Sequence, residues 1–307
     1  MQMSGSGGAR RVVVGVDGSP ESVEAARFAA EEAGFRALEL VVVHACVPAS
    51  RRSLQDVAAA EAASRAAGQV LVDEVLAQVQ VPPTITVRTV VEVGPVAALL
   101  TAVAADEALL VLGQHGLDPA DGRWTGQVAP TVAGNVACPV VVVPAGWSRT
   151  LAGDARPASR PIVVGVGGKG SAALVLRVAY DEAELRRASL MIFHASTGNG
   201  LSAADRATTE HDVAEIVTDR HRDLPEVAVD YRFEPRATLA AWVEASSRAR
   251  LLVLGRPQGP GGHRAWQYGL VRAMLQHARC PLLVVPSVLR PVLAIAPYPL
   301  RIALLVP

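Results

Sequence analysis

The chain has 307 residues, half of them hydrophobic, which is more than one ordinary domain needs and enough to fill two cores. Its 29 Lys and Arg balance its 29 Asp and Glu, so no net charge draws it to nucleic acid or to an anionic membrane. Three widely spaced cysteines, Cys46, Cys138 and Cys280, predict neither a disulfide framework nor a zinc site, and we expect them to be small buried side chains.

Short apolar runs alternate with longer helical patterns through the first half of the chain, which predicts a parallel sheet covered by helices. Residues 1–9, before the first run, are rich in Gly and Ser, and we expect a flexible N-terminus. They lack the apolar segment of a secretory signal, which predicts a cytoplasmic protein. The strands are expected over residues 11–16, 38–44, 85–91, 108–112 and 139–143.

Helical patterns fill the spaces between these strands. After the first strand, Ser19 is suited to cap a helix and Pro20 to occupy its first turn. The stretch 54–79 is rich in Ala, Glu and Leu, which favour a helix. Pro95 suits the first turn of a third helix, and a fourth is expected from about Gln127.

The same pattern occurs a second time. The sequence VVVGVDGSPESVEAARFAAEEAGFRALELVVVHA from Val12 matches IVVGVGGKGSAALVLRVAYDEAELRRASLMIFHA from Ile162 without a gap, 150 residues later. The motif CPVVVVP at 138–144 is likewise answered by CPLLVVP at 280–286. The chain therefore contains one kind of domain twice, and helical patterns recur at 202–221 and 238–249.

The repeats set the predicted domain organisation. Turn formers without apolar periodicity predict a linker between the copies, and the last residues fall outside the repeat. The tail is apolar, but its arginines and prolines argue against a membrane helix, so it would either pack on a domain or partner or be disordered. In chain order we expect a first domain at 10–146, the linker at 147–159, a second domain at 160–287 and the tail at 288–307.

Parallel sheets bind ligands at the carboxyl ends of their strands, where connections leave in opposite directions. Two segments of the first half lie at such ends: VDGSP at 16–20 and GQHGLDPADGRWTG at 113–126. Asp17 is a carboxylate at the end of a buried strand, so it needs hydrogen-bond donors. An adenine amino group or a ribose hydroxyl would supply them, and so would the backbone of its own turn.

The glycines of the second segment carry a family resemblance. Gly113, Gly116 and Gly126 are separated by two and nine residues, and the run CPVVVV follows. With this spacing the chain resembles tandem-domain members of the universal stress protein family, of the actinobacterial type. The family signature has Ser or Thr after the third glycine, where this chain has Gln127. The resemblance implies an α/β fold of two tandem Rossmann-like domains, each a five-stranded parallel sheet flanked by helices.

Many members of this family bind ATP, so the resemblance implies ATP, with or without Mg²⁺, in the first domain. The three glycines would surround the triphosphate, because glycine lets backbone N–H groups approach phosphate oxygens. Asp17 and the backbone around Ala45 would hold the nucleoside. Gln127 would face the outer phosphate, and because its amide is longer than a hydroxyl, we expect weaker ATP binding than in relatives with Ser or Thr. 

Other polar residues of the first domain allow two interpretations. Thr125, His115 and Arg123 would either compensate for the missing hydroxyl or be solvated loop residues. His44 and His194 end apolar strands, and we expect core histidines bonded to nearby backbone rather than metal ligands or general bases. No nucleophile–base set or pair of carboxylates falls beside the loop, so no enzymatic activity beyond slow ATP hydrolysis is expected.

The second domain should bind ATP poorly, because its equivalents of the contact residues differ. Gly167 stands where the first domain has its aspartate, and alignment on the Cys-Pro motifs puts Gln258 and Tyr268 at two of the glycine positions. The alternative is that Lys169 or Arg256 restores anion binding there.

Two functions follow from these residues and from the resemblance. One is an ATP-binding regulator of the stress response, with the nucleotide in the first domain. The other is a nucleotide-independent dimerisation or interaction scaffold with degenerate ATP sites. Because family domains commonly pair through their last strands, the resemblance implies pairing of the two domains within the chain and allows a homodimer. No nucleic-acid or membrane partner is expected.

Overall fold

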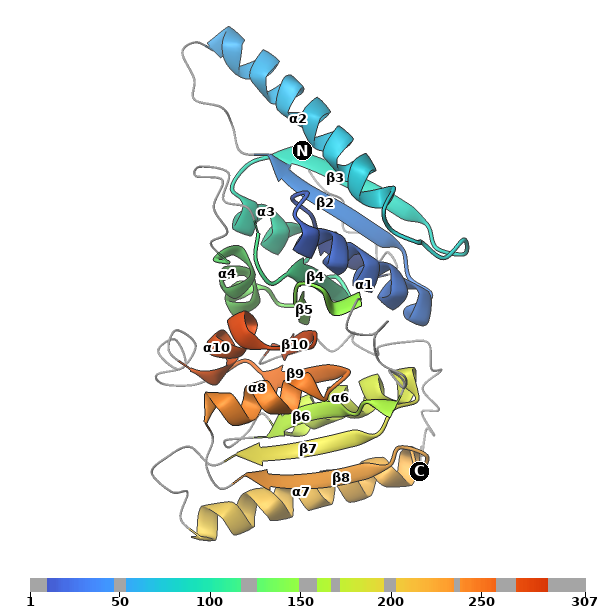
Figure 1. The fold of residues 1–307 in the computed structure, drawn as a ribbon, viewed down its shortest axis with the longest axis vertical. Helices are drawn as coiled ribbons and strands as arrows, with labels where there is room; N and C mark the ends of the chain where they lie inside the picture. The colour runs from blue at the N-terminus through green and yellow to red at the C-terminus, as the bar shows by residue number, and fades with distance from the viewer. Residues whose placement is uncertain are drawn as a thin grey trace, which may run out of the picture.

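The computed structural model describes residues 10–46, 54–116, 126–148, 159–166, 172–195, 203–234, 238–257 and 269–286. The N-terminal stretch at 1–9, the tail at 288–307 and most of the expected linker lie outside these residues, so the expectations for them are not tested. The described part divides into two domains of the same design, from β1 to β5 and from β6 to β10 (Figure 1).

Strands and helices alternate in both domains, as the sequence pattern predicts. The first domain consists of β1 (Val12–Gly15), α1 (Pro20–Arg36), β2 (Leu40–Cys46), α2 (Leu54–Leu76), β3 (Val87–Val93), α3 (Val96–Val103), β4 (Leu109–Gly113), α4 (Val128–Asn135) and β5 (Val140–Val143). The second consists of β6 (Ile162–Val166), α6 (Ala172–Arg186), β7 (Leu190–Ala195), α7 (Ala203–Asp223), β8 (Val229–Glu234), α8 (Leu239–Ser247), β9 (Leu251–Gly255), α10 (Leu270–His277) and β10 (Leu282–Val285).

Local chemistry accounts for the ends of α1. The Ser19 side chain accepts a hydrogen bond of 3.0 Å from the backbone N–H of Ser22, and Pro20 is the first helical residue, as predicted. The helix ends before Ala37, which has the left-handed φ of 51°. Because this residue closes the helix, β2 begins at Leu40, two residues after its predicted start.

All ten strands form a single sheet in the order β3-β2-β1-β4-β5-β10-β9-β6-β7-β8 (Figure 1). Within each domain neighbouring strands are parallel, so the predicted pair of five-stranded parallel sheets flanked by helices is confirmed. Where the domains meet, β5 and β10 are antiparallel, with Val141 opposite Leu283.

The strand order of the first domain reverses between β1 and β4. From β1 the chain proceeds outward to β2 and β3, and β4 and β5 lie on the other side. Right-handed crossovers then place α1 and α2 on one face of the sheet and α3 and α4 on the other. Figure 1 shows α3 and α4 next to each other and apart from α1. The carboxyl ends of β1 and β4 are therefore the topological switch point, where such sheets bind ligands.

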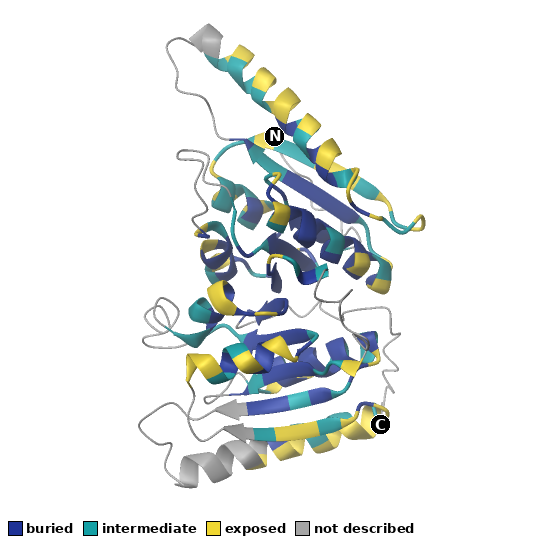
Figure 2. Ribbon diagram, in the orientation of Figure 1, coloured by how far each residue is buried: buried dark blue, intermediate teal, exposed yellow. Residues whose placement is uncertain are grey.

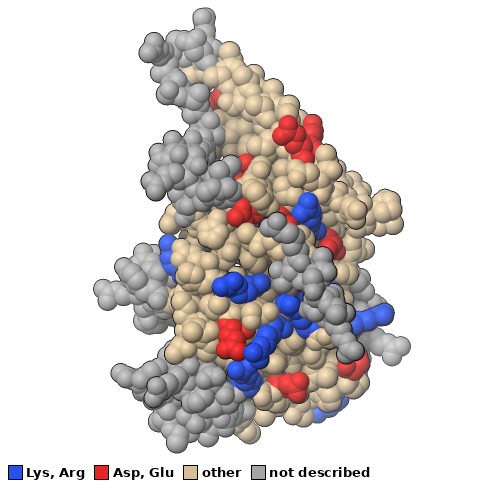
Figure 3. Space-filling model, in the orientation of Figure 1, with Lys and Arg blue, Asp and Glu red and all other residues tan. Residues whose placement is uncertain are grey.

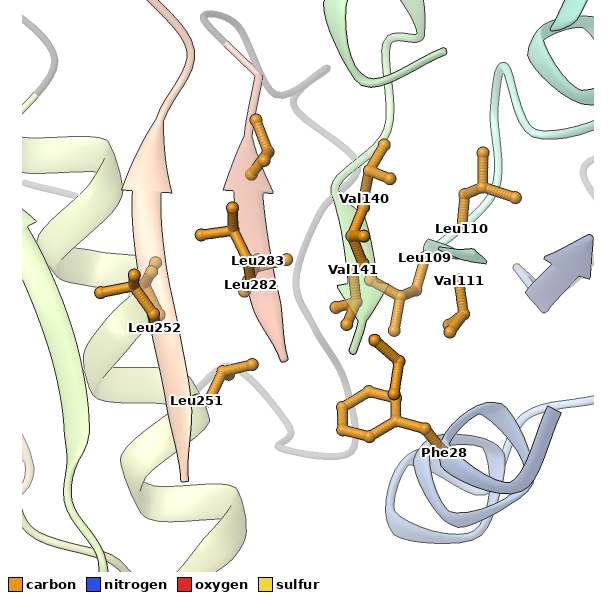
Figure 4. Packing of buried hydrophobic residues seen from close by; sticks show 14 of the residues in the cluster. Phe28, Leu109, Leu110, Val111, Val140, Val141, Leu251, Leu252, Leu282 and Leu283 are labelled. Atoms are coloured by element: carbon orange, nitrogen blue, oxygen red, sulfur yellow. The ribbon is translucent and has the colours of Figure 1, made fainter. Parts of the chain in front are cut away.

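The central strands are buried on both faces, which explains why they consist of unbroken Val and Leu runs. Figure 2 shows buried residues along the middle of the sheet and exposed ones on the outer side of α2. In Figure 4, Leu282 and Leu283 of β10 lie close to Val140 and Val141 of β5. The hydrophobic core therefore continues from one domain into the other.

A buried cluster of charges also joins the domains. Glu32 and Arg36 of α1 are answered, 150 residues later, by Glu182 and Arg186 of α6. Arg36 donates a hydrogen bond of 2.6 Å to Glu182, and Arg186 donates one to Glu32. Each arginine also bonds to the glutamate one turn earlier in its own helix. Every carboxylate is thus shared between two guanidinium groups, one from each domain.

The cysteines match the sequence-based expectation, since Cys46, Cys138 and Cys280 are all buried and unbridged. Burial raises the pKa of Cys138 and of Cys280 to about 12, so both remain neutral thiols near pH 7. None of the helices in the described residues is both long enough and apolar enough to span a bilayer.

Candidate functional site

A cavity of about 300 Å³ opens at the carboxyl ends of β1, β2 and β4. The start of α4 and one side of α3 complete its wall. All six residues expected from the sequence to bind a nucleotide line it, namely Asp17, Ala45, Gly113, Gly116, Gly126 and Gln127. The structure thus brings together residues from distant parts of the first domain, and what they bind stays a prediction.

Asp17 belongs to the turn that leads from β1 into α1. Its Oδ1 accepts a hydrogen bond of 3.0 Å from the backbone N–H of Ser19, so the carboxylate does support its own turn. Gly18 between them has a φ of 81°, a left-handed conformation that glycine adopts without strain. The Oδ2 atom lies on the side of the loop after β4, because a Cβ added to Gly116 would be 2.8 Å from it. The carboxylate therefore has one oxygen in the turn and the other toward the glycine loop.

Each of the three glycine positions in this loop disfavours a larger residue for a different reason. A Cβ on Gly113 would lie 2.9 Å from the backbone carbonyl carbon of Glu21 in α1, so this glycine permits close helix packing. Gly116 leaves room for the Asp17 carboxylate. Gly126 has a φ of 59°, which disfavours other residues. All three positions thus have a reason within the protein itself, in addition to any role in binding phosphate.

His44 lies at the carboxyl end of β2 and forms part of the cavity wall. Its Nδ1 is 2.8 Å from the backbone oxygen of Val16, and because a carbonyl only accepts, Nδ1 carries the proton. The expected bond to nearby backbone is confirmed, but His44 is half-buried at the cavity rather than part of the core. Sequence reasoning missed its place beside the cavity, although its position at a strand end was the available signal. The side chain of His194, its equivalent, lies outside the described residues.

Helix α4 begins at the edge of the cavity, with Gln127 as its N-cap residue. The Gln127 side chain makes no capping bond to the first turn, and its Oε1 instead accepts a hydrogen bond of 3.3 Å from Nη2 of Arg272. Val128 and Ala129, whose N–H groups have no partner inside the helix, also line the cavity. The positive end of the α4 dipole is therefore at the cavity wall.

The loop between β4 and α4 is described only at its two ends. His115 lines the cavity beside Gly116. Thr125 and Arg123, the other two side chains considered as compensating donors, lie outside the described residues, and so do Gly167, Gln258 and Tyr268 of the second domain.

In the second domain, aromatic rings occupy positions equivalent to the cavity wall. Phe193 is the equivalent of Val43 in the repeat, and Trp242 is the equivalent of Leu100 by the spacing of the Cys-Pro motifs. Their rings meet edge to face with centroids 4.5 Å apart, and both side chains are buried. Trp242 also packs on β6, since a Cβ on Gly165 would lie 2.7 Å from its ring. Sequence reasoning missed this contact, because it joins two residues that are distant in the chain.

Arg256, one of the two residues expected to rescue a second anion site, has another role. Its Nη1 donates a hydrogen bond of 2.8 Å to the backbone oxygen of Val136 and one of 3.4 Å to that of Ala133. Both carbonyls are at the C-terminal end of α4, where a cation is favourable. Arg256 therefore bonds to the first domain in this structure, which speaks against the Arg256 half of the alternative that Lys169 or Arg256 restores anion binding in the second domain. Lys169 lies outside the described residues.

Comparisons with known proteins agree with this architecture. Residues 8–144 and 158–286 each match the universal stress protein family. A universal stress protein of Mycobacterium tuberculosis (strain H37Rv) is 30% identical over 304 residues, which cover 92% of this chain and 98% of that protein. A solved universal stress protein from Archaeoglobus fulgidus shares the fold with a TM-score of 0.64 at 11% identity, covering 90% of this chain and 98% of its own. A universal stress protein solved in complex with cAMP is 26% identical, covers 45% of this chain and 99% of its own, and has a TM-score of 0.35, too low to support an inference.

Proposed function

The chain belongs to the universal stress protein family, and we propose that its first domain binds ATP and that the protein acts through this nucleotide as a regulator of the stress response. The main support is the convergence of six residues, chosen from sequence, on one cavity at the switch point of the sheet. Its volume of about 300 Å³ is at the lower end of the range of about 300–1,000 Å³ for small-molecule sites.

The wall of the cavity suits the two parts of a nucleotide. Val43, Leu100 and Leu112 offer apolar surface against which a base can pack. Near them, the Asp17 carboxylate can accept from a ribose hydroxyl or an adenine amino group, and the backbone of Ala45 can bond to the base edge. The nucleoside would therefore be held at the ends of β1 and β2.

The phosphates would extend toward the glycine loop and α4. Backbone N–H groups at Val128 and Ala129, together with the helix dipole, favour an anion at this end of the cavity. A Mg²⁺ ion bound with ATP would be held mainly by the phosphates and water, because this ion usually takes only one or two carboxylates from the protein.

A second candidate is the interaction scaffold without a nucleotide. It is favoured by the close packing of Gly113 against α1 and of Gly116 against Asp17, because this packing requires glycine at both positions even when no phosphate is bound. The antiparallel pairing of β5 with β10 adds a continuous sheet between the domains. In this view the chain would act through its paired domains or as a homodimer, and the cavity would be a remnant.

Nucleotide content separates the two candidates. Purified protein would be extracted with acid and the nucleotide per chain measured by chromatography, followed by calorimetry with ATP, AMP and GTP. Asp17→Asn keeps an oxygen for the Ser19 N–H but removes the charge, so it should weaken ATP binding about tenfold or more. Thr238→Ala removes a helix cap of the same kind from α8 in the second domain, outside the lining of this cavity, and should leave affinity within about twofold. An absence of ATP binding in the parent protein would favour the scaffold.

A further inference from the structure

We propose that Arg272, in the second domain, completes the phosphate-binding part of the first-domain site. Residues of both domains would then bind the phosphates of a single nucleotide. The inference rests on the proposed nucleotide site and specifies how its phosphate end is built. It also gives the second domain a role in binding that does not require a nucleotide of its own.

The position of Arg272 follows from the pairing of β5 with β10. That pairing brings α10 beside α4, as Figure 1 shows. Arg272 is in the first turn of α10, and its Nη2 lies 3.3 Å from Oε1 of Gln127. Gln127 in turn lines the cavity where α4 begins. The guanidinium group therefore lies against Gln127 at the edge of the first-domain cavity, although Arg272 is not itself among the residues that line the cavity.

Among the described residues, positive charge gathers around the guanidinium group of Arg272. Arg272 is near the N-terminus of its own helix and bonds to the N-cap residue of α4, and the N-terminus of a helix carries a partial positive charge. No carboxylate forms an ion pair with Arg272 in the part of the chain that the structure describes. A cation is disfavoured at such helix ends, and a phosphate group placed there would neutralise it through charge-assisted hydrogen bonds.

The contact with Arg272 also determines which way the Gln127 amide points. A guanidinium group only donates, so the amide oxygen faces Arg272 and the NH₂ group is left as a donor. The rim then presents N–H groups from both side chains. Gln127 in this arrangement is a donor supported by Arg272, rather than a poor replacement for a hydroxyl.

The contact between Arg272 and Gln127 has no counterpart at the equivalent position of the repeat. By the spacing of the two Cys-Pro motifs, the residue of α4 equivalent to Arg272 is Pro130, which carries neither charge nor donor. At this position the first domain therefore offers no matching cation to the second. The first domain, which receives the cation, is also the domain with the open cavity. In the second domain, the aromatic rings of Phe193 and Trp242 take the positions of cavity-lining residues.

Calorimetry on the full-length protein tests this assignment with ATP and AMP as ligands. Arg272→Ala should lower ATP affinity about tenfold or more and change AMP affinity less than about twofold, because AMP lacks the outer phosphates. Arg272→Lys, which keeps the charge but loses the fork of donors, should fall between the parent and the alanine variant. Thermal unfolding would check that each variant is folded. If Arg272→Ala does not fold, Arg272→Lys alone provides the test.

A control for general charge is needed, because Figure 3 shows most basic side chains on this face gathered over the second domain. Arg222 of α7 has a side chain 73% exposed and lies on the outermost helix of that domain, so Arg222→Ala removes the same charge far from the cavity. It should leave ATP affinity within about twofold at physiological salt.

Each outcome has a definite meaning. If the parent binds neither nucleotide, the proposed function fails and the inference fails with it. If the parent binds ATP and Arg272→Ala binds it equally well, the nucleotide site stands and the role of Arg272 is overturned. Equal losses for ATP and AMP would also overturn it, since they would mean that Arg272 supports the cavity as a whole. A selective loss for ATP, absent in Arg222→Ala, supports it.

Discussion

Arg36 of the first domain donates a hydrogen bond of 2.6 Å to Glu182 of the second, and both side chains are buried. The reciprocal bond from Arg186 to Glu32 joins the same two helices, so equivalent residues of the repeat contact each other in both directions. Such reciprocity is the property of an interface with two-fold symmetry. The antiparallel strands β5 and β10 are likewise equivalent in the repeat and pair with each other.

The buried cluster should be costly to break. Burial alone would raise the pKa of Glu182, but the guanidinium groups of Arg186 and Arg36 outweigh it and lower that pKa. Glu182→Gln leaves buried positive charge without its partner and should reduce the free energy of unfolding by about 3–5 kcal/mol. Urea unfolding would measure this loss.

A matched control is available on the surface. Glu244 and Arg248 form an exposed ion pair within α8, with side chains 55% and 70% exposed, so Glu244→Gln should cost less than about 1 kcal/mol. If the two variants lost the same small amount of stability, the cluster would not hold the domains together.

Asp181, the neighbour of Glu182, should make stability depend on pH in the opposite direction to Glu182. Burial raises the pKa of Asp181 from 3.8 to about 6, although Arg220 and Arg177 act in the other direction. A raised pKa means that the folded state binds the proton more tightly than the unfolded state does. The stabilising contribution of this proton is complete below the ordinary pKa and is lost as the pH rises through the pKa of the folded state. The lowered pKa of Glu182 has the reverse effect, with stability lost only as the pH falls below the ordinary range for Glu.

The variant Asp181→Asn should remove this loss. Between the ordinary value of 3.8 and about 6, the parent should lose on the order of 1–3 kcal/mol of stability that the variant keeps. Urea unfolding of both proteins at several pH values through this interval provides the test. Parallel stability curves for parent and variant would show that the aspartate does not titrate as described.

Gly113 and Gly116 should respond differently to the same substitution. Gly113→Ala places a methyl group against the backbone of Glu21, which cannot move aside easily, and should destabilise the protein by about 1–3 kcal/mol. Gly116→Ala places it against the Asp17 carboxylate, a side chain at the cavity, and should lower ATP affinity about tenfold with a smaller loss of stability. Thermal unfolding and calorimetry on both variants would separate the two effects, and a reversed pattern would mean that Gly116 is the structural position.

Several elements were predictable from sequence because local signals and the repeat agree on them. Ser19 and Pro20 mark the start of α1, and the gapless repeat predicts two domains with parallel sheets. The location of Asp17 and the glycine loop beside one cavity follows from a general rule, since the carboxyl ends of parallel strands share one edge of the sheet. Such inferences need the topology of one domain and no knowledge of side-chain packing.

Other features depend on contacts that no local pattern encodes. Arg272 reaches the first domain only because β5 and β10 pair, and its own sequence context is an ordinary amphipathic helix. Phe193 looks like a routine strand residue until Trp242, distant in the chain, packs against it. The role of Gly113 likewise depends on how closely α1 approaches β4. These three cases require the tertiary structure.

A further prediction concerns the number of nucleotides per chain, which should be one. Phe193 and Trp242 occupy positions where the first domain has Val43 and Leu100 at its cavity, and larger buried rings leave less space for a base. Calorimetry should therefore give a stoichiometry near one ATP per chain, and Asp17→Asn should weaken this single event. A stoichiometry near two, or undiminished binding in Asp17→Asn, would place a site in the second domain.

Replacing the tryptophan tests the same asymmetry through stability. Trp242→Leu installs the first-domain residue at the equivalent position and removes much of a buried ring, so it should cost about 2–4 kcal/mol of unfolding free energy. Because Trp242 packs inside the second domain against Phe193 and Gly165, ATP affinity should remain within about twofold of the parent and the stoichiometry near one ATP per chain. A marginal effect on stability would mean that the ring is not a packed part of the second core, and a second equivalent of bound ATP would show that the ring alone had closed an otherwise competent site.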